Sequence, residues 1–173
     1  MITIISSTNR HNSATHKVAL HLEKHLRARE KPCKLLNFEK LPHDFIFSNF
    51  NNNSNKEFQQ TIDAYIVPAV KFIFVIPEYN GGFPGILKAF IDCIPPKHFY
   101  GKQAALVGVA DGHAGALRAL DMFTLVLNHI RVNVHWNRPK LSDINNHFEG
   151  NFEDNDLDEL YSRRVETMIT DFA

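Results

Sequence analysis

The sequence lacks an excess of charge of either sign, and this excludes several kinds of partner. Lysine and arginine together number 19, aspartate and glutamate also number 19, and the formal net charge is zero. Proteins that bind nucleic acid or an anionic membrane surface usually carry a basic excess. No apolar run approaches the length of about 20 residues that a membrane-spanning helix needs. We therefore expect a protein that acts on small molecules, without nucleic acid and without a membrane.

Cysteine is also scarce. The chain has only Cys33 and Cys93, which are too few for the disulfide framework of a small secreted protein. Both stand in apolar patterns, so we expect them to be buried as small hydrophobic side chains. The amino terminus begins with a strand-like run rather than with a signal peptide. Together these features predict a cytoplasmic protein.

Short apolar runs and helical patterns alternate along the chain. Runs typical of strands occupy residues 1–5, 33–37, 72–76, 104–110 and 131–135. Apolar residues recur at helical spacing around Val18, Leu22 and Leu26, and again in residues 57–67, 85–94, 116–130 and 157–172. Residues 38–55 and 137–155 are polar and predict irregular structure, with an asparagine-rich surface loop at 49–55. The alternation predicts an α/β, flavodoxin-like three-layer α/β/α sandwich with a five-stranded parallel sheet, residues 1–173 forming a single domain.

The most informative stretch is residues 77–85, Pro-Glu-Tyr-Asn-Gly-Gly-Phe-Pro-Gly, which follows the most apolar run of the chain. Such a run predicts a strand that is buried on both faces of a parallel sheet. The loop after it would open at the carboxyl end of the sheet, where α/β proteins bind ligands. Gly81 and Gly82 would allow a sharp turn close to a flat ligand. Composition alone is equally consistent with an ordinary strand-to-helix connection.

The loop between the first strand and the first helix is rich in groups that bind anions. The N–H groups at the start of a helix are unpaired and carry partial positive charge. Ser7, Ser13 and Thr15 add hydroxyl groups, Arg10 adds a guanidinium group, and the loop contains no acidic residue. We predict a phosphate site here, whereas the simpler interpretation is an N-cap by Ser13 or Thr15. The glycine motifs of P-loops and of dinucleotide-binding folds are absent.

Taken together, these loops resemble those of NADPH-dependent FMN reductases. The first loop is similar to the phosphate loop of that family in Ser7, Arg10, Ser13 and Thr15, followed by Ala19. The second is similar to its flavin-ring loop and the helix after it in Pro77, Glu78, Tyr79, Asn80, Pro84, Gly85, Leu87, Lys88 and Asp92. The second match is the more specific, and the resemblance spans residue 2 to about residue 135.

The resemblance implies that FMN, rather than a catalytic side chain, carries hydride from NADPH or NADH to quinones, azo compounds, metal ions or free flavin. It implies FMN contacts from three loops, namely from Ser7, Arg10, Ser13, Ala14, Thr15, Pro77, Glu78, Tyr79, Asn80, Gly81, Asp111 and Gly112. Family members commonly form homodimers or homotetramers. Two features depart from the family pattern: the first loop is one residue longer between Ser7 and Arg10, and Ala110-Asp111-Gly112 replaces the more usual Ser-Pro-Gly.

Two other functions are consistent with FMN binding. A flavodoxin-type electron carrier would bind FMN without a nicotinamide, but such carriers are usually acidic and surround the ring with aromatic side chains. A catalytically silent interaction module should have lost the donors of the phosphate loop, and this chain retains them. Glu78 could be a proton donor, although an orienting role is favoured.

Two further patterns lie outside these loops. His21 and His25 have the i, i+4 spacing of metal ligands, but no third ligand is evident nearby, and we expect no metal site. The helices at 85–94 and 116–130 carry more apolar residues than one buried stripe needs, which favours an interface between subunits. The surplus residues are Phe90, Ile91, Met122, Phe123 and Val126.

Overall fold

The computed structural model describes residues 1–50, 55–148 and 156–173. Its centre is a parallel sheet with the strand order β2-β1-β3-β4-β5, to which the short strand β6 is added along the carboxyl-terminal part of β4. The strands are β1 (Ile2–Ser6), β2 (Cys33–Asn37), β3 (Lys71–Pro77), β4 (Gln103–Val109), β5 (Asn133–Val134) and β6 (Lys140–Leu141). The predicted parallel sheet is confirmed, and β6 is a sixth strand that the sequence pattern did not reveal.

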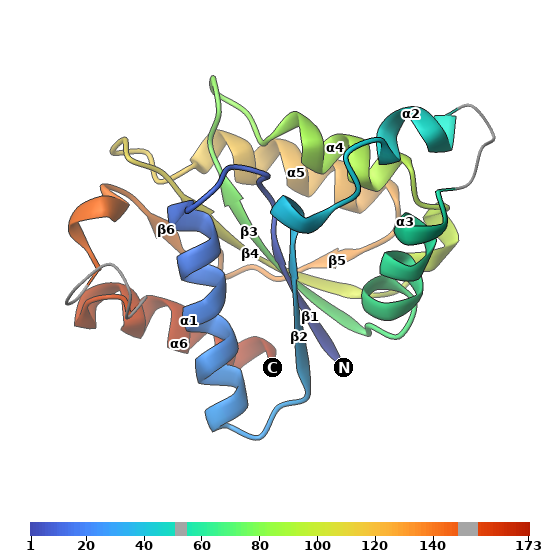
Figure 1. Cartoon of the computed structure of the whole chain (residues 1–173). Helices are drawn as coiled ribbons and strands as arrows, with labels where there is room; N and C mark the ends of the chain where they lie inside the picture. The colour runs from blue at the N-terminus through green and yellow to red at the C-terminus, as the bar shows by residue number, and fades with distance from the viewer. Residues whose placement is uncertain (51–54, 149–155) are drawn as a thin grey trace.

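Helices cover both faces of the sheet (Figure 1). On one face lie α1 (Ala14–Ala28) and α6 (Glu159–Phe172). On the other lie α3 (Lys56–Thr61), the wider helical turn η2 (Ile62–Ile66), α4 (Gly85–Asp92) and α5 (Leu117–His129). Shorter elements are η1 (Phe38–Lys40), α2 (Phe45–Phe50), η3 (Pro96–His98) and η4 (Ile144–Asn146). This is the predicted flavodoxin-like three-layer sandwich.

The two cores follow from the alternation of side chains along β3. Phe72, Phe74 and Ile76 enter the core under α4 and α5, and Ile73 and Val75 enter the core under α1 and α6. Successive residues of a strand point to opposite faces, so an unbroken apolar run fills both cores. Phenylalanine is concentrated in the first core, where eight rings are buried: Phe38, Phe45, Phe58, Phe72, Phe74, Phe90, Phe99 and Phe123.

Several local predictions were wrong. Residues 45–50 form α2 where a loop was expected, and residues 140–141 form β6. Of the asparagine-rich segment 49–55, residues 51–54 lie outside the described residues. Cys33 and Cys93 are only partly buried because each lies at the edge of its core, yet burial still raises the pKa of both thiols. Within the described ranges, no helix combines the length and apolar character needed to cross a membrane.

Candidate functional site

A cavity of about 290 Å³ lies where the loops after β1, β3 and β4 meet. These three strands are neighbours in the sheet, so their carboxyl ends bring the loops together, as is usual for ligand sites of open α/β sheets. The residues lining the cavity are Arg10, His11, Ser13, Ala14, Thr15, Pro77, Glu78, Tyr79, Val109, Ala110, Asp111, Ile144 and Asn145. Eight of the predicted cofactor residues are among them: Arg10, Ser13, Ala14, Thr15, Pro77, Glu78, Tyr79 and Asp111.

The first turn of α1 lines this cavity with groups that are able to bind an anion. Ser13 is the N-cap, and its Oγ accepts a hydrogen bond of 3.1 Å from the backbone N–H of His16. Its hydroxyl proton remains available to a ligand, because capping uses only a lone pair. The N–H groups of Ala14 and Thr15 stand in the first turn, where a helix offers them no partner. The N-cap and the anion site are therefore compatible at the same residue.

Ser7 has a different environment from the one predicted. It is fully buried, its Oγ donates to the carbonyl oxygen of Val75 at 2.6 Å, and it does not line the cavity. Its backbone N–H donates to the same carbonyl at 3.2 Å. Ser7 therefore anchors the start of the loop to β3. The sequence could not show this, because the partner is 68 residues away.

Tyr79 and Arg10 join the first loop to the second. The Tyr79 hydroxyl lies 2.7 Å from Oγ1 of the buried Thr8, which also accepts a hydrogen bond of 3.3 Å from the backbone N–H of Arg10. The guanidinium carbon of Arg10 lies 3.9 Å from the centroid of the Tyr79 ring, a cation–π contact. Thr8 is a positioning residue that the sequence analysis missed. Its only signal was its place in a hydroxyl-rich loop.

The second loop forms a tight hairpin at its tip. The backbone N–H of Tyr79 donates to the carbonyl oxygen of Gly82 at 2.8 Å, and the N–H of Gly82 donates to the carbonyl oxygen of Tyr79 at 3.1 Å. Asn80 and Gly81, at the tip, have positive φ angles of 52° and 82°, as a type I′ turn requires. Both tip residues are exposed and lie outside the cavity lining. The backbone N–H of Tyr79 is thus engaged within the hairpin, which leaves the side chain of this expected FMN contact to face the cavity.

Glu78 presents an unsatisfied carboxylate oxygen to this region. Its Oε1 accepts a hydrogen bond of 3.0 Å from Arg118 on α5, whereas its Oε2 is buried and has no hydrogen-bond partner among the described residues. The side chain is only 14% exposed and lines the cavity. A buried oxygen without a partner is rare in proteins, so Glu78 retains the capacity to accept one further hydrogen bond.

The third loop is joined by a segment that the sequence pattern had left irregular. Ile144 and Asn145 of η4 line the cavity, and the backbone N–H of Ile144 donates to Ala110 at 3.3 Å. The side-chain amide of Asn145 donates to Asp111 at 3.0 Å. Gly112 is exposed and lies outside the lining. No periodicity in residues 137–148 could have indicated that this segment walls the site.

The residues of the cavity fit FMN. The first loop and the start of α1 supply a guanidinium group, two hydroxyls and the open N–H groups of a helix start, which suit a terminal phosphate. The first turn of α1 contains no acidic residue that would repel it. The second loop supplies a tyrosine ring and, on Glu78, a buried acceptor without a partner among the described residues, which suit a flat ring system that carries N–H groups.

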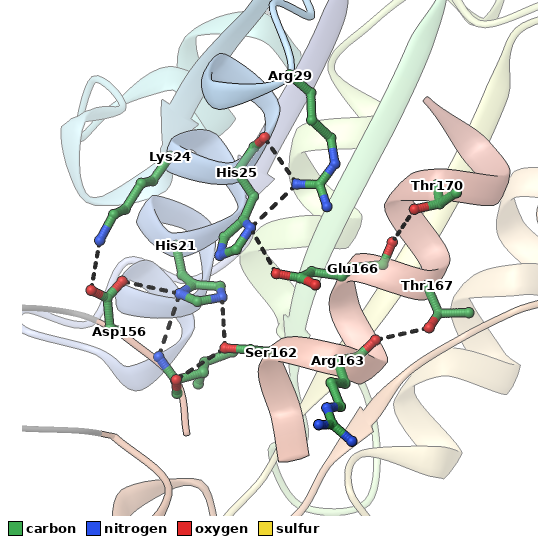
Figure 2. Close-up of polar contacts among 11 residues, drawn as sticks. His21, Lys24, His25, Arg29, Asp156, Ser162, Arg163, Glu166, Thr167 and Thr170 are labelled. Atoms are coloured by element: carbon green, nitrogen blue, oxygen red, sulfur yellow. Dashed lines mark hydrogen bonds and ion pairs between the residues drawn. The ribbon is translucent and has the colours of Figure 1, made fainter. Parts of the chain in front are cut away.

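The His21–His25 pair does not line the cavity and lies between α1 and α6 (Figure 2). The two ring centroids are 4.3 Å apart. His21 Nδ1 lies 3.3 Å from Asp156 and His25 Nδ1 lies 3.1 Å from Glu166. Among the described residues, no three or more histidine, cysteine, aspartate or glutamate side chains are arranged so that they could hold a metal ion. The pair is a structural contact between the two helices.

Comparison with known proteins gives a consistent result. The flavoenzyme FerB, an NAD(P)H:(acceptor) oxidoreductase from Paracoccus denitrificans, aligns over 99% of this chain and 93% of its own with 22% identity and a TM-score of 0.80. The apo form of the NADH:FMN oxidoreductase EMOB aligns over 99% and 89% with 21% identity and a TM-score of 0.73. Flavodoxin from Megasphaera elsdenii aligns over 83% and 86% with 11% identity and a TM-score of 0.53. These likenesses show a common fold.

The sequence carries the more specific result. The pattern of the NADPH-dependent FMN reductase family matches residues 1–137. This range includes all three loops of the site, but not η4, which also lines the cavity. This agrees with the extent of the resemblance expected from the loops alone. The chain belongs to the NADPH-dependent FMN reductase family.

Proposed function

We propose that this FMN-dependent NAD(P)H oxidoreductase reduces quinones, free flavin or similar small acceptors, with residues 1–173 acting as one FMN-binding domain. The observation that carries the proposal is the shared cavity, in which the first turn of α1 and the hairpin loop after β3 face the same space. When bound, FMN supplies the redox chemistry by taking hydride from the nicotinamide and releasing it to the acceptor. The protein supplies position and electrostatics.

The phosphate end of the site is assigned to Arg10, Ser13 and Thr15 with the backbone N–H groups of Ala14 and Thr15. Charge-assisted hydrogen bonds from a guanidinium group are strong and directional. Ser7 contributes indirectly, since it anchors the loop to β3 through Val75. Arg10 rests on Tyr79, so phosphate binding and ring binding share one contact.

The flavin ring is assigned to Pro77, Glu78 and Tyr79 of the second loop together with Asp111 of the third. Arg118 fixes one oxygen of Glu78 and leaves the other to accept a hydrogen bond from the ring. Asn80, Gly81 and Gly112 stand at the rim, where they would contact only the outer edge of the cofactor.

The open rim favours a reductase over an electron carrier. Leaving aside the chain neighbours of each glycine, no atom of the described residues lies within 4 Å of a Cβ placed at Gly81 or at Gly112. Neither the hairpin tip nor the third loop therefore carries a side chain at these positions that would cover the cofactor. Hydride transfer requires the nicotinamide to stack directly on the flavin, and an open rim provides the space for this.

A homodimer or homotetramer is part of the proposal, although the residues differ from those expected. Phe90, Ile91 and Phe123 are buried in the core and Val126 is partly buried against it. Of the predicted surplus, only Met122 is largely exposed. It is joined on the surface by Leu117 and Leu125 of α5 and by Trp136. Such a patch beside the hairpin would suit a two-fold interface.

We place the protein in the cytoplasm. Cys33 and Cys93 are both free thiols, which suits a reducing compartment. Their raised pKa values, caused by partial burial, keep both protonated and unreactive at neutral pH. Expression with a cytoplasmic and a periplasmic leader, followed by thiol titration, would test whether an oxidising setting harms the fold.

The test of function is anaerobic stopped-flow spectroscopy at the flavin absorbance band. We expect NADPH or NADH to bleach the bound flavin without a partner protein, and a small quinone to restore its colour. Flavin that stays oxidised under an excess of both nucleotides, yet is reduced by dithionite, would contradict the reductase and favour an electron carrier. Comparing the two nucleotides would also establish which one the enzyme prefers.

A further inference from the structure

His11 lines the FMN cavity and belongs to none of the residues expected from the family resemblance. We propose that His11, paired with Glu39, is a proton-dependent ligand of the FMN phosphate, so that cofactor binding takes up a proton. The inference rests on the assignment of the phosphate to the first turn of α1. It adds a binding residue and a pH dependence that this assignment alone does not contain.

The geometry gives His11 one occupied and one available nitrogen. Its Nδ1 lies 2.6 Å from Oε1 of Glu39, which stands on η1 after β2. The backbone N–H of Glu39 is itself held by the side chain of Asn37 at 3.1 Å. The imidazole is 78% exposed, and it follows Arg10, which also lines the cavity. Because Nδ1 is engaged by Glu39, Nε2 is the nitrogen that is available to a ligand.

The Glu39 carboxylate determines which atom carries the proton of this hydrogen bond. An ionised carboxylate only accepts hydrogen bonds, so the proton between the two groups belongs to Nδ1. In neutral His11 the other nitrogen, Nε2, then carries a lone pair, which would face the oxygens of a phosphate. In the imidazolium form Nε2 carries a proton and donates. His11 is therefore a phosphate ligand only when it is charged.

The charges around His11 favour this form when phosphate is present. Glu39 is anionic, and its pKa is held below the usual range mainly by the hydrogen bond from His11. Arg10 precedes His11 in the loop, His16 on α1 acts on Glu39, and Lys40 on η1 and Glu23 on α1 act on His16. Burial lowers the pKa of His16, so His16 stays neutral at neutral pH. A bound phosphate would add a second anion beside the His11 ring and so stabilise its imidazolium form.

Linkage gives the direction of the effect. A ligand that binds the imidazolium form of His11 better than the neutral form must bind more tightly as the pH falls. Coupling of one pKa unit corresponds to about a tenfold change in affinity. The second pKa of the FMN phosphate is about 6, so the measurement belongs above that value, where the phosphate is a dianion.

The experiment is a titration of the apoprotein with FMN, followed by flavin fluorescence, from about pH 6.5 to about pH 8.5. We expect the Kd of the wild type to rise about tenfold across this range and that of His11→Gln to stay constant, the two converging at high pH. His43→Gln, an exposed histidine outside the cavity, is the matched control and should follow the wild type. Riboflavin, which lacks the phosphate, should show no dependence on pH with any variant.

A second readout counts the proton directly. Calorimetric titration of FMN in two buffers of different ionisation enthalpy should show uptake of up to about one proton by the wild type and none by His11→Gln. Glu39→Gln keeps the hydrogen bond but removes the charge, so its pH transition should move to lower pH. These variants are at exposed or partly exposed positions, and unfolding curves verify that they fold.

The possible failures are distinguishable. If Arg10→Ala leaves the affinity for FMN unchanged, the phosphate is not bound in this loop, and both the assignment and the inference are wrong. If Arg10→Ala weakens FMN while the wild type and His11→Gln show parallel pH profiles, the assignment stands. In that case His11 and Glu39 only tie the loop to η1, and the inference is overturned.

Discussion

Helix α1 carries polar side chains in two regions that differ in how completely they are paired. In its first turn, the N–H groups of Ala14 and Thr15 have no partner within the helix, and the hydroxyl of Ser13 is only half used. Two turns later, His21 is 2% exposed and is bonded on both ring nitrogens to the chain before and within α6 (Figure 2). The first region opens into a cavity, whereas the second closes a contact.

His21, Ser162 and Leu157 are connected to one another by hydrogen bonds. The backbone N–H of Leu157 points at Nδ1 over 3.4 Å, Nε2 lies 3.3 Å from Ser162 Oγ, and this hydroxyl donates to the Leu157 carbonyl at 3.0 Å. Since the Ser162 proton is used in this way, its oxygen accepts from Nε2, which therefore carries a proton. Nδ1 lies close to the Leu157 N–H and also 3.3 Å from the Asp156 carboxylate, while burial lowers the pKa of His21 and so favours the neutral ring. Ser162, His21 and Asp156 resemble a hydrolytic triad in composition, but the serine proton is already committed to a backbone carbonyl.

The difference teaches how to separate a site from a structural contact. Both regions hold serine, histidine and basic side chains, so composition does not distinguish them. What distinguishes them is how many hydrogen-bond donors and acceptors are still without a partner. Around His21 these groups are paired with one another, whereas around Ser13 several are still available to a ligand. The following experiments test this contrast, from the largest expected effect to the smallest.

Arg10→Ala should weaken FMN binding by about 1.5–3 kcal/mol, the range for hydrogen bonds to charged groups. The stability of the apoprotein should change little, because Arg10 is exposed and loses only its contact with Tyr79. Fluorescence titration measures the affinity, and urea unfolding without FMN measures the stability. Arg27→Ala, at the opposite end of α1 and paired only on the surface with Glu23, is the control and should alter neither property.

His21→Leu should produce the opposite pattern. The change leaves the buried N–H of Leu157 and the hydroxyl of Ser162 without their ring partner, at a cost of about 1–3 kcal/mol in the free energy of unfolding. FMN affinity should be unaltered, because the cluster does not touch the cavity. His25→Gln removes a more exposed partner of Glu166 and should cost less. A loss of FMN binding in His21→Leu at full stability would contradict the contrast.

Gly81→Ala should destabilise the hairpin by roughly 1–2 kcal/mol, because a side chain is strained at a φ of 82° even though the surrounding space is empty. Gly82→Ala is the matched control. Its φ lies outside the left-handed region, and among the described residues its new Cβ would meet Met122, at 3.5 Å, a normal contact. We expect FMN to be bound more weakly by the first variant alone. Equal affinities would show that the tip geometry does not organise the site.

Mild acid should weaken the α1–α6 contact before it unfolds the rest of the protein. Burial, and next the charge of His25, lower the pKa of His21 against the opposing effect of Asp156. Its contribution to stability is therefore fully present above about pH 6.5 and is lost as the pH falls through the lowered pKa. Asp156, whose pKa is lowered chiefly by Lys24, loses its contribution only in stronger acid.

Thermal unfolding of the apoprotein from about pH 7.5 to about pH 5 measures this effect. The melting temperature of the wild type should fall over this range, and that of His21→Leu should fall less. Identical slopes for the two proteins would show that other groups carry the acid sensitivity.

The fold was predictable because its sheet is built from apolar runs whose burial requires no knowledge of partners. Residues 72–76, for example, can only be placed in a strand covered on both faces. The edge strands were less visible. The two residues of β6 gain their strand character from pairing with Gly108 and Val109, and nothing in their own sequence indicates it.

The candidate site was predictable where a residue acts through its own chemistry. Arg10, Ser13 and Thr15 were expected at a helix start because donors gather there, and they line the cavity. Ser7 is a hydroxyl of the same loop, yet it is buried on Val75 because β1 pairs with β3. Sequence alone does not decide which of two nearby hydroxyls faces a ligand.

Residues that act through distant partners were not predictable. The i, i+4 spacing correctly placed His21 and His25 together, but their acidic partners come from the chain 135 and more residues later. In the same way, Ile144 and Asn145 reach the cavity only because β6 extends the sheet beside the third loop.

Trp136 gives the protein an internal optical probe of assembly. It is the single tryptophan of the chain and is 78% exposed, next to Leu125 of α5 at the same surface hollow. An indole in contact with water emits at long wavelength, and covering it with a second subunit shifts the emission to the blue. Dilution from high to low protein concentration, followed by the tryptophan spectrum alone, would therefore report on the α5 face without a label and independently of the flavin.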